Sequence, residues 1–476
     1  MIFIIAFTNY TAINPNIYKK LNNKNPMLSE IFKAYDVRGV YGQTLTEDIA
    51  YKIGRAFVYF LNCKNVVVGT DMRLSSPKLS NAFMKGVTEQ GANAIFIGRV
   101  STDAVYFASG FLNKPAVMFT ASHNPMQYNG MKFCKNNAIP INENTGLKKI
   151  KEIIEKNKLE KQKTKKHGKI IKKEILKDYV GHVRNFIEIK KLSDLKIAVD
   201  AGNGMAGKII PLVYKNLPVE IVPLYFKLDG TFPNHPADPS KYENLVKLQK
   251  IVKEKKCDFG MAFDGDADRI FFVDENGNVI NSSMISSLII KNILTKNKNK
   301  KLKIIYNVVC SHIVPETILK FGGTPVIERV GHSFIKETMR KTKAVFACEH
   351  SAHYYYRDNY RADSGIITSL IVAEIVSKEN KPLSLLLDEF RKYHNIEETS
   401  IEVKDKDAKL KEIEEIYNKQ NPKKISKLDG ITIEFDNWWF NLRPSNTEPL
   451  LRLNLEANSE ELMKEKKEEL IRIIKD

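Results

Sequence analysis

One arrangement occurs three times along the chain and constrains its fold more than any other feature. In each case an apolar run ends in a polar loop, a helix-like stretch follows, and a second apolar run ends in another polar loop. Strands that alternate with helical patterns are typical of parallel sheets built from βαβ units. The sequence therefore predicts three related α/β domains with mixed, mostly parallel sheets, although no residue-level repeat is strict. The paired runs span 65–73 and 116–125, 195–204 and 259–269, and 302–311 and 344–353.

The pattern changes from about residue 391. Alternating strands joined by short turns replace the longer units, which predicts a smaller α+β domain at the C-terminus. The Lys- and Glu-rich segment 148–174 and the turn at Asn276-Gly277-Asn278 mark further boundaries. For 476 residues we predict a leader and four domains. The predicted ranges are 1–26 (a disordered leader, or residues upstream of an alternative start at Met27), 27–172, 173–279, 280–390 and 391–476.

Composition narrows the class of protein. Hydrophobic content of 43% and charged content of 28% are ordinary for a soluble globular protein, and no apolar run approaches the roughly 18 residues of a membrane helix. Five scattered cysteines without a CxxC pair argue against a disulfide framework or a zinc site and favour a reducing cytoplasm. The formal net charge of +19 would suit a nucleic-acid binder. Because the lysines are spread along helical faces and linkers, we interpret them as solvated surface that attracts anionic small substrates.

Three carboxylates at alternate positions follow the second apolar run of the second block, in Asp264-Gly265-Asp266-Ala267-Asp268-Arg269. They can curl round one cation, and without one they would repel each other at close range. All-oxygen ligands suit a hard ion, Mg²⁺ or Ca²⁺. An EF-hand is excluded because Arg269 replaces the sharp-turn Gly and strand-like runs flank the segment. We predict a metal site, with an aspartyl-phosphate phosphatase that uses Asp264 as nucleophile as the rival interpretation.

Ser122 directly precedes His123 in the loop TASHNP, and this pair suggests a hydrolase. In an extended segment, however, adjacent side chains point to opposite sides, so we expect His123 to be badly placed to deprotonate Ser122. Pro125 biases Asn124 away from helix, which favours an exposed loop at the end of the strand. We therefore expect His123 to shape the loop or to neighbour a phosphate.

Glycines 202, 204 and 207 match the dinucleotide fingerprint G-x-G-x-x-G after an apolar run, and Glu220 lies near the place of a ribose-binding acid. A tight turn between strand and helix requires the same glycines. We interpret the segment as a structural turn.

Four further segments are weaker when taken alone. Residues 349–353, EHSAH, offer a carboxylate, a hydroxyl and an imidazole, which suit vicinal hydroxyls of a sugar. Residues 443–447, RPSNT, combine a guanidinium fork with hydroxyl and loop amide donors, which suits a phosphate. Residues 32–39 and 329–336 place basic groups beside the starts of helices, where anions bind.

Taken together and in this order, these motifs resemble the α-D-phosphohexomutase family, specifically its phosphomannomutase/phosphoglucomutase branch. The resemblance covers nearly the whole chain from about residue 29. It implies four domains, three related α/β domains and a smaller C-terminal one, around a central cleft. The motifs that carry it are YDVRG, TASHNP, NGMKF, DGDADR, GHSFIK, EHSAHYYYRD and WFNLRPSNTEPLLRL.

The resemblance also implies roles for single residues. Ser122 would be a phosphoserine in the active enzyme, and Mg²⁺ would be bound by an oxygen of this group together with Asp264, Asp266 and Asp268. The implied contacts are Glu349, Ser351 and His353 with sugar hydroxyls, Arg443, Ser445, Asn446 and Thr447 with the phosphate that does not react, and Arg38, Lys132, Arg269 and His332 at the reacting end.

The implied reaction, that of an isomerase, reversibly moves a phosphoryl group between positions 1 and 6 of a hexose phosphate. Mannose phosphates are the expected substrates, with glucose phosphates as well, through a hexose 1,6-bisphosphate that is both intermediate and activator. Phosphoglucosamine mutase is an alternative. The general base is one of Lys132, Glu349 and His353. The expected partner is a small phosphosugar, with no nucleic acid or membrane partner, and the expected state is a cytoplasmic monomer or weak dimer.

Three positions depart from the family pattern. Cys348 stands where the family usually has Gly, and Ala352 stands where Gly is common. Val309 stands where related bacterial enzymes often have a Lys that contacts a phosphate. We expect these differences to affect sugar preference and affinity and not the type of reaction.

Overall fold

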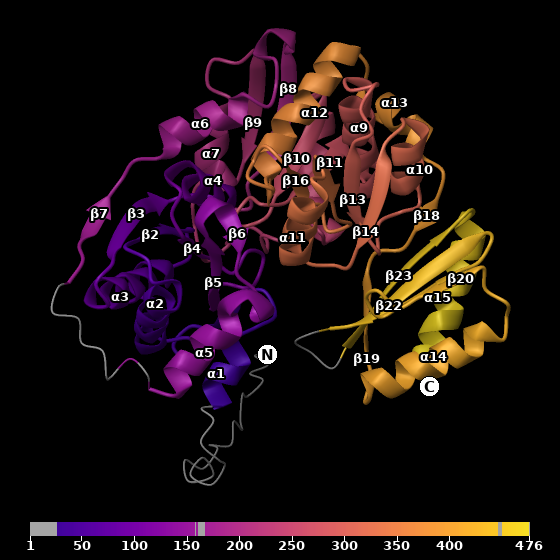
Figure 1. Ribbon diagram of the computed structural model, residues 1–476. Helices are drawn as coiled ribbons and strands as arrows, with labels where there is room; N and C mark the ends of the chain where they lie inside the picture. Colours follow the sequence, from indigo (N-terminus) through magenta and orange to yellow (C-terminus); the bar gives the residue numbers. More distant parts are fainter. Residues whose placement is uncertain (1–25, 158, 160–166, 446–449, 476) are drawn as a thin grey trace, which may run out of the picture.

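The computed structural model describes residues 26–157, 159, 167–445 and 450–475. Its strands form four sheets that follow one another along the chain (Figure 1). The predicted leader 1–26 lies outside the described residues except for Pro26, with which the first helix begins.

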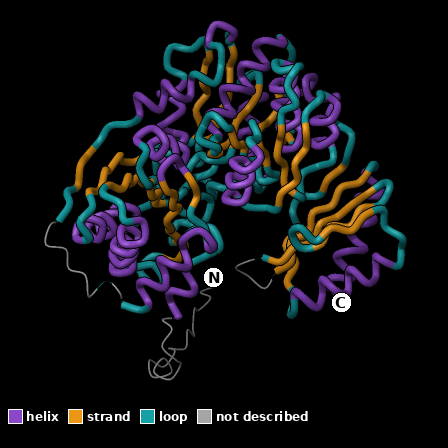
Figure 2. Tube along the Cα trace, in the orientation of Figure 1, coloured by secondary structure: helices purple, strands orange, loops and turns teal. Residues whose placement is uncertain are grey.

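The first sheet has the strand order β1-β5-β4-β2-β3-β7, and β6 pairs with β5. Helices flank its strands, as they do in the next two domains (Figure 2). Its strands are β1 (Val37–Val40), β2 (Asn65–Thr70), β3 (Asn93–Arg99), β4 (Ala116–Phe119), β5 (Tyr128–Lys135), β6 (Ile139–Pro140) and β7 (Ile170–Lys172), and its helices are α1 (Pro26–Ile31), α2 (Glu47–Leu61), α3 (Ser76–Glu89), α4 (Thr102–Leu112) and α5 (Lys148–Glu155).

The second and third sheets are smaller and resemble each other, with the orders β12-β11-β10-β8-β9 and β14-β13-β15-β16-β17. The second domain comprises β8 (Leu195–Asp200), β9 (Val219–Leu224), β10 (Phe259–Phe263), β11 (Ile270–Asp274), β12 (Val279–Ile280), α6 (Leu176–Arg184), α7 (Ala206–Val213) and α8 (Val246–Glu254). The third comprises β13 (Lys303–Asn307), β14 (Thr324–Glu328), β15 (Phe346–Cys348), β16 (Tyr354–Tyr356), β17 (Ala362–Asp363), α9 (Ser282–Thr295), α10 (Ile313–Lys320), α11 (His332–Thr342), α12 (Gly365–Glu379) and α13 (Leu383–Leu387).

The six apolar runs of the repeated pattern are all strands, and the two runs of each block are neighbours in one sheet. The pairs β2 with β4, β8 with β10 and β13 with β15 are parallel. Since the carboxyl ends of parallel strands meet at one edge, the polar loops of each block lie side by side.

In each domain the second of these strands then turns back into an antiparallel partner, β5, β11 or β16. The loops TASHNP, DGDADR and EHSAH therefore occupy equivalent places, which confirms the equivalence expected from the sequence. The sheets are mixed as predicted, with parallel and antiparallel pairings in equal share. The antiparallel share exceeds the expectation because each returning strand also pairs antiparallel with a further strand: β5 with β1 and β6, β11 with β12, and β16 with β17.

The fourth domain is antiparallel throughout, with the order β18-β23-β22-β21-β20, while β19 also pairs with β23. Its two helices lie on one side of the sheet (Figure 1), which confirms the predicted α+β type. Its elements are β18 (His394–Asn395), β19 (Thr399–Glu402), β20 (Lys424–Ser426), β21 (Ile431–Glu434), β22 (Trp438–Pro444), β23 (Leu450–Ala457), α14 (Lys406–Asn418) and α15 (Glu460–Lys475).

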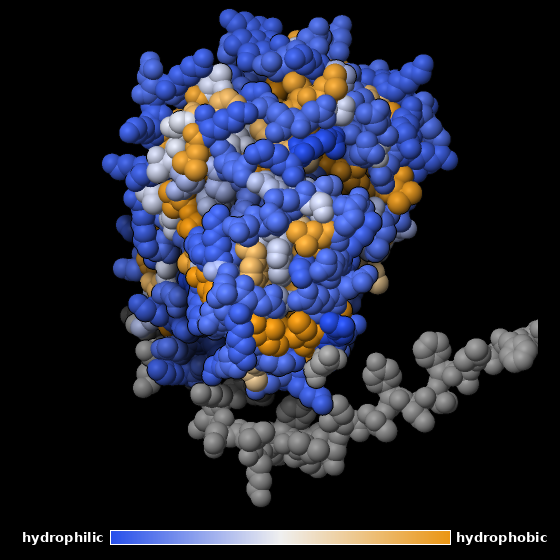
Figure 3. All heavy atoms as spheres, turned by 90° about the vertical axis from the view of Figure 1, so that its right-hand side faces the viewer, coloured by the Kyte–Doolittle hydropathy of each residue, from blue (hydrophilic) through white to orange (hydrophobic). Residues whose placement is uncertain are grey.

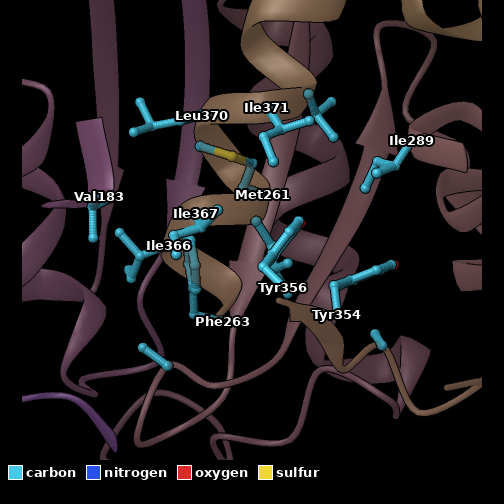
Figure 4. Close-up of a cluster of buried hydrophobic side chains, with 14 of the residues drawn as sticks. Val183, Met261, Phe263, Ile289, Tyr354, Tyr356, Ile366, Ile367, Leu370 and Ile371 are labelled. Carbon is cyan, nitrogen blue, oxygen red and sulfur yellow. The ribbon is translucent and has the colours of Figure 1, made fainter. Parts of the chain in front are cut away.

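A single apolar cluster joins the second and third domains and reaches α4 of the first. At its centre is α12, whose side chains from 365 to 376 are all buried. In Figure 4, Ile366 and Ile367 of this helix lie among side chains from α6, β10 and β16. The first and fourth domains add separate clusters of their own. The first three domains are thus held together by shared apolar packing, which positions their loops relative to one another.

The outer surface contrasts with this core. The face that carries the fourth domain is largely hydrophilic with small apolar patches (Figure 3). Among the described residues, no helix combines the length and apolar character needed to cross a membrane.

Candidate active site and metal centre

The three equivalent loops share a backbone feature. Each contains a non-glycine residue in the left-handed region: Ser122 with φ 51°, Ala267 with φ 62° and Ala352 with φ 63°. This conformation costs roughly 1 kcal/mol or more for a residue with a Cβ, and it is concentrated at functional sites. The tight turns therefore store strain at the places where the chemistry-bearing side chains converge.

Ser122 is buried and contacts the DGDADR loop of the second domain, the predicted metal loop. Its Oγ donates a hydrogen bond of 2.6 Å to Asp264 Oδ2, although the two residues are 142 positions apart in sequence. Arg269 Nη2 approaches the same Oγ at 3.5 Å. The TASHNP and DGDADR loops thus meet, as the predicted site requires.

The expectation that the side chain of His123 points away from Ser122 is wrong. Its Nδ1 lies 3.3 Å from Ser122 Oγ, because the left-handed backbone at Ser122 turns the segment and keeps adjacent side chains on one side. Burial, followed by the nearby Arg269 and Arg38 guanidiniums, holds the pKa of His123 well below its usual range. His123 is therefore a neutral imidazole beside the serine, while the stronger hydrogen bond of Ser122 goes to Asp264.

A residue to which the sequence assigned no role shapes the serine loop. The guanidinium of Arg73, fully buried, donates to the backbone carbonyls of Ser122 (2.8 Å), Asn124 (2.6 Å), Pro125 (2.8 Å) and Tyr128 (2.9 Å). One side chain thereby fixes the loop at four points. The signal was present in the sequence, since Arg73 ends the first polar loop of the block.

The carboxylates of Asp264, Asp266 and Asp268 are buried and offer ligand atoms within 4.8 Å of one another. Asp266 Oδ1 and Asp268 Oδ1 have no hydrogen-bond partner among the described residues. A buried carboxylate oxygen without a partner is costly unless a cation occupies its place. The residues present therefore fit a hard divalent ion with oxygen ligands.

Lys132 and Arg269 pair with the carboxylates of this triad. Lys132 Nζ donates to Asp266 Oδ2 at 2.8 Å and to Asp268 Oδ2 at 2.5 Å. Burial lowers the pKa of Lys132, but these two carboxylates outweigh it and raise the pKa well above its usual range. Asp264 Oδ2 accepts a hydrogen bond from Arg269 Nε at 3.1 Å. Burial and the negative charges of Asp268 and Asp266 nevertheless raise the pKa of Asp264 well above its usual value. The site holds more negative charge than its own cations neutralise.

Helix α4 supports the triad from the first domain. Thr102 Oγ1 donates to Asp266 Oδ2 at 2.6 Å. The neighbouring Asp103 accepts hydrogen bonds from Ser101, Tyr179 and Ser364, and burial raises its pKa to about 6. These hydroxyls come from the first three domains, so Asp103 fixes α4 at their junction. No local sequence signal could have identified Thr102 or Asp103.

Glu349 of the EHSAH loop is buried, and its carboxylate accepts hydrogen bonds from other groups of the protein. It accepts hydrogen bonds from Tyr355 Oη, from Asn307 Nδ2 at 3.1 Å and from the backbone N–H of Gly331 at 3.1 Å. Burial raises its pKa. A sugar hydroxyl that contacts Glu349 would share the carboxylate with these three donors.

His353 lies between the EHSAH loop and the metal loop. Its Nδ1 is 2.9 Å from Ser351 Oγ, and its Nε2 faces Asp268 Oδ1 at 3.7 Å. Burial lowers the pKa of His353 to about 3. The ring is therefore neutral at pH 7, and Nε2 makes no hydrogen bond within the described part of the chain.

Two further residues of the predicted reacting end belong to the same region. Arg38 Nη1 donates to Asn124 Oδ1 at 2.6 Å, which ties it to the serine loop. His332, at the start of α11, has its pKa lowered well below the usual range by burial and then by Lys336 and Lys132. Tyr35 packs edge-on against His332 with ring centroids 5.9 Å apart, which links the first and third domains.

The predicted phosphate loop follows β22. Arg443 Nη2 donates to Glu398 Oε2 at 2.6 Å, and Arg452 Nη1 donates to Glu398 Oε1 at 3.1 Å. Burial would raise the pKa of Glu398, but the two guanidiniums hold it at about 2. Ser445 is buried. The predicted ligands Asn446 and Thr447 lie outside the described residues.

The glycine fingerprint is structural, as predicted. Gly202 adopts φ 50°, and a Cβ on Gly204 would lie 2.7 Å from the carbonyl oxygen of Gly265. The turn lets the metal loop approach the backbone closely. The loop DGDADR also closes the antiparallel hairpin of β10 and β11, in agreement with the rejection of an EF-hand.

Models of the family described as phosphoglucomutase/phosphomannomutase match this chain along nearly its whole length. Its alpha/beta/alpha domains I, II and III match residues 29–161, 177–277 and 281–393, and its C-terminal domain matches residues 398–473.

Individual relatives agree. A phosphomannomutase of Vibrio cholerae is 40% identical over 459 residues, covering 93% of this chain and 98% of the relative. A phosphomannomutase of Methanocaldococcus jannaschii is 40% identical over 446 residues, covering 93% of this chain and 97% of the relative. The crystal structure of a phosphoglucomutase/phosphomannomutase family protein from Burkholderia thailandensis superposes with a TM-score of 0.83 at 30% identity, covering 94% of this chain and 97% of that one. The chain therefore belongs to the phosphoglucomutase/phosphomannomutase family and is a phosphohexomutase, an isomerase that transfers phosphoryl groups between hexose phosphates.

Proposed function

We propose that the chain interconverts mannose 1-phosphate and mannose 6-phosphate, and glucose 1-phosphate and glucose 6-phosphate as well, in the cytoplasm. Ser122 would carry the phosphoryl group, and a hexose 1,6-bisphosphate would be the intermediate. The observation that carries the proposal is the 2.6 Å contact of Ser122 Oγ with the buried triad of aspartates. The names of the relatives at 40% identity support mannose phosphates as the first substrates.

In the first transfer, the free hydroxyl oxygen of the sugar forms a bond to phosphorus while the bond from phosphorus to Ser122 Oγ breaks. The hydroxyl proton passes to His353 Nε2, the ring nitrogen without a hydrogen bond. Arg269, 3.5 Å from Ser122 Oγ, stabilises the charge that develops there. The bisphosphate then turns end for end, and the same steps in reverse return its other phosphate to Ser122.

The remaining residues position the reactants. Asp264, Asp266 and Asp268 would hold Mg²⁺, which when bound neutralises charge on the phosphoryl oxygens. Arg443 and the loop after it would grip the phosphate that does not react, in either orientation of the sugar. Of the three candidate bases, Lys132 is held as a cation by its two carboxylates, and Glu349 accepts three hydrogen bonds already. This leaves His353.

The test is phosphopeptide mapping combined with coupled assays of mannose and glucose phosphates, with Mg²⁺ and a trace of hexose bisphosphate. We expect phosphate on Ser122 and near-complete loss of activity in Ser122→Ala, whereas Ser193→Ala, an exposed serine elsewhere, retains both. Activity that survives Ser122→Ala would favour the phosphatase alternative with Asp264 as nucleophile. Turnover of glucosamine phosphates alone would make the sugar assignment wrong.

A further inference from the structure

A second group of metal-ligand side chains lies beside the triad. It consists of His353, Asp268 and Asp363, called here the His353 cluster, whose ligand atoms lie within 4.8 Å of one another. His353 Nε2 is 3.7 Å from Asp268 Oδ1 and 3.9 Å from Asp363 Oδ2. We propose that this cluster is a transition-metal site, distinct from the all-oxygen triad, for Zn²⁺ or a similar divalent ion.

The spacing of the atoms suits such an ion. Since the third separation, between the two carboxylate oxygens, is at most 4.8 Å, a point equidistant from the three atoms lies about 2.1–2.5 Å from each, close to the Zn–N and Zn–O bond lengths of roughly 2.0–2.2 Å. A shift of a few tenths of an ångström closes the difference. The mixture of one imidazole nitrogen and two carboxylate oxygens favours zinc over Mg²⁺, which selects oxygen ligands. The cysteine pattern excludes a thiolate zinc site, and this cluster uses no cysteine.

Each carboxylate of the cluster pairs with a lysine through one of its two oxygens. Asp268 Oδ2 accepts from Lys132 Nζ at 2.5 Å, and Asp363 Oδ1 pairs with Lys336 Nζ at 2.7 Å, which leaves the other oxygen of each carboxylate for the cluster. Asp268 is 2% exposed, and its Oδ1 has no hydrogen-bond partner within the described residues. The imidazole completes the set in the tautomer that carries its proton on Nδ1, beside Ser351 Oγ at 2.9 Å, because the lone pair is then on Nε2.

The surrounding charge admits one divalent ion. Five carboxylates and three cations are linked by direct contacts here, which leaves two formal negative charges. They are Asp264, Asp266, Asp268, Glu349 and Asp363, with Lys132, Arg269 and Lys336. Since the triad and the His353 cluster share Asp268, ions at the two places compete for one oxygen, and zinc at the cluster displaces Mg²⁺ from the triad.

The test is calorimetric titration of the chelator-treated full chain with Zn²⁺ and with Mg²⁺, in wild type and two single variants. His353→Gln should weaken Zn²⁺ binding at least about 10-fold and leave the Mg²⁺ affinity within about 3-fold. Asp266→Asn should do the reverse, with Mg²⁺ affected far more than Zn²⁺. Co²⁺ bound to wild type should show the visible absorption of a site with a nitrogen ligand, and His353→Gln should lose it.

His235→Gln is the matched control, because His235 Nε2 lies 3.0 Å from Asp200 Oδ2, and Asp200 is not a member of the His353 cluster. Asp363→Asn is a second test of the cluster, with a thermal melt to verify its fold, since Lys336 loses its partner. Zinc affinity in His353→Gln equal to that of wild type would overturn the proposal. An equal loss of zinc and magnesium affinity in this variant would also overturn it, because His353 would then only shape the triad. These readouts involve no turnover, so a failure of the proposed function leaves them unaffected.

Discussion

The predicted metal loop at 264–269 and the proposed phosphate clamp around Arg443 both present charged groups, but the protein supports them in different ways. The aspartates of the metal loop are at most 2% exposed and are contacted by Ser122, Lys132 and Thr102, all from the first domain. Arg443 is held by Glu398 of its own domain. The metal loop is therefore completed by contacts from another domain, whereas Arg443 of the clamp is held by a residue of its own domain.

The fourth domain, which carries the clamp, is attached to the rest of the protein differently from the first three domains. It joins the third domain through polar contacts, such as the backbone N–H of His312 with Glu456 Oε1 at 3.0 Å and that of Val330 with Asp429 Oδ2 at 3.0 Å. His312 also stacks on Trp439 with centroids 5.2 Å apart. The first three domains share one large apolar cluster instead. We expect the clamp to move as a unit toward a rigid metal centre.

The largest effect should come from Asp266→Asn. Removing a buried ligand from the triad should abolish measurable Mg²⁺ binding and lower kcat at least about 100-fold, since a bound ion contributes several kcal/mol to phosphoryl transfer. Calorimetry and the coupled mutase assay measure the two effects. Asp194→Asn, an exposed carboxylate, is the control. Normal Mg²⁺ affinity in Asp266→Asn would contradict the assignment of the metal loop.

A smaller effect is expected for Thr102→Val, which removes the hydroxyl that donates to Asp266 but keeps the shape of the side chain. Mg²⁺ affinity should fall about 10- to 100-fold, with partial recovery of activity at high Mg²⁺. Thr317→Val, which removes a buried hydroxyl of α10, serves as the control. If Mg²⁺ affinity is unchanged, the first domain does not support the triad through this bond.

A substitution in the clamp should change the KM for hexose phosphates and leave the Mg²⁺ affinity unchanged. Glu398→Gln keeps the shape of the side chain and removes a negative charge beside Arg443 and Arg452, so the KM for hexose phosphates should fall about 2- to 10-fold. Steady-state kinetics and calorimetry with Mg²⁺ measure the contrast. A fall in kcat together with weaker Mg²⁺ binding would remove the distinction between the two regions.

The smallest effect concerns acid stability. Arg443 and Arg452 depress the folded pKa of Glu398 to about 2, so its stabilisation is present above its unfolded pKa of about 4.3 and is lost as pH falls toward 2. Because the side chain is 27% exposed, we expect a contribution of only about 1 kcal/mol. Denaturant unfolding from pH 5 to pH 2.5 should show a steeper loss for wild type than for Glu398→Gln. Parallel curves would rule out this contribution.

The parts of the site that local patterns predicted are those that follow a strand directly. The strand ends placed Ser122, the aspartates 264–268 and the EHSAH loop at equivalent positions, and the sheets confirm this equivalence. The position of His123 was mispredicted because an extended backbone was assumed, while the left-handed turn at Ser122 depends on the packing of its loop around Arg73. Roles for Ser445 and Arg443 stay predictions.

The sequence by itself determined which chemical groups each loop carries and the type of domain that carries it, because apolar periodicity and turn residues act over a few neighbouring positions. Tertiary structure alone decided which loops meet. The contact of Ser122 with Asp264, the support of Asp266 by Thr102 and the approach of Asp363 to His353 join residues from different elements. Such contacts depend on how separate sheets pack against one another, and no short-range pattern of residues encodes that packing.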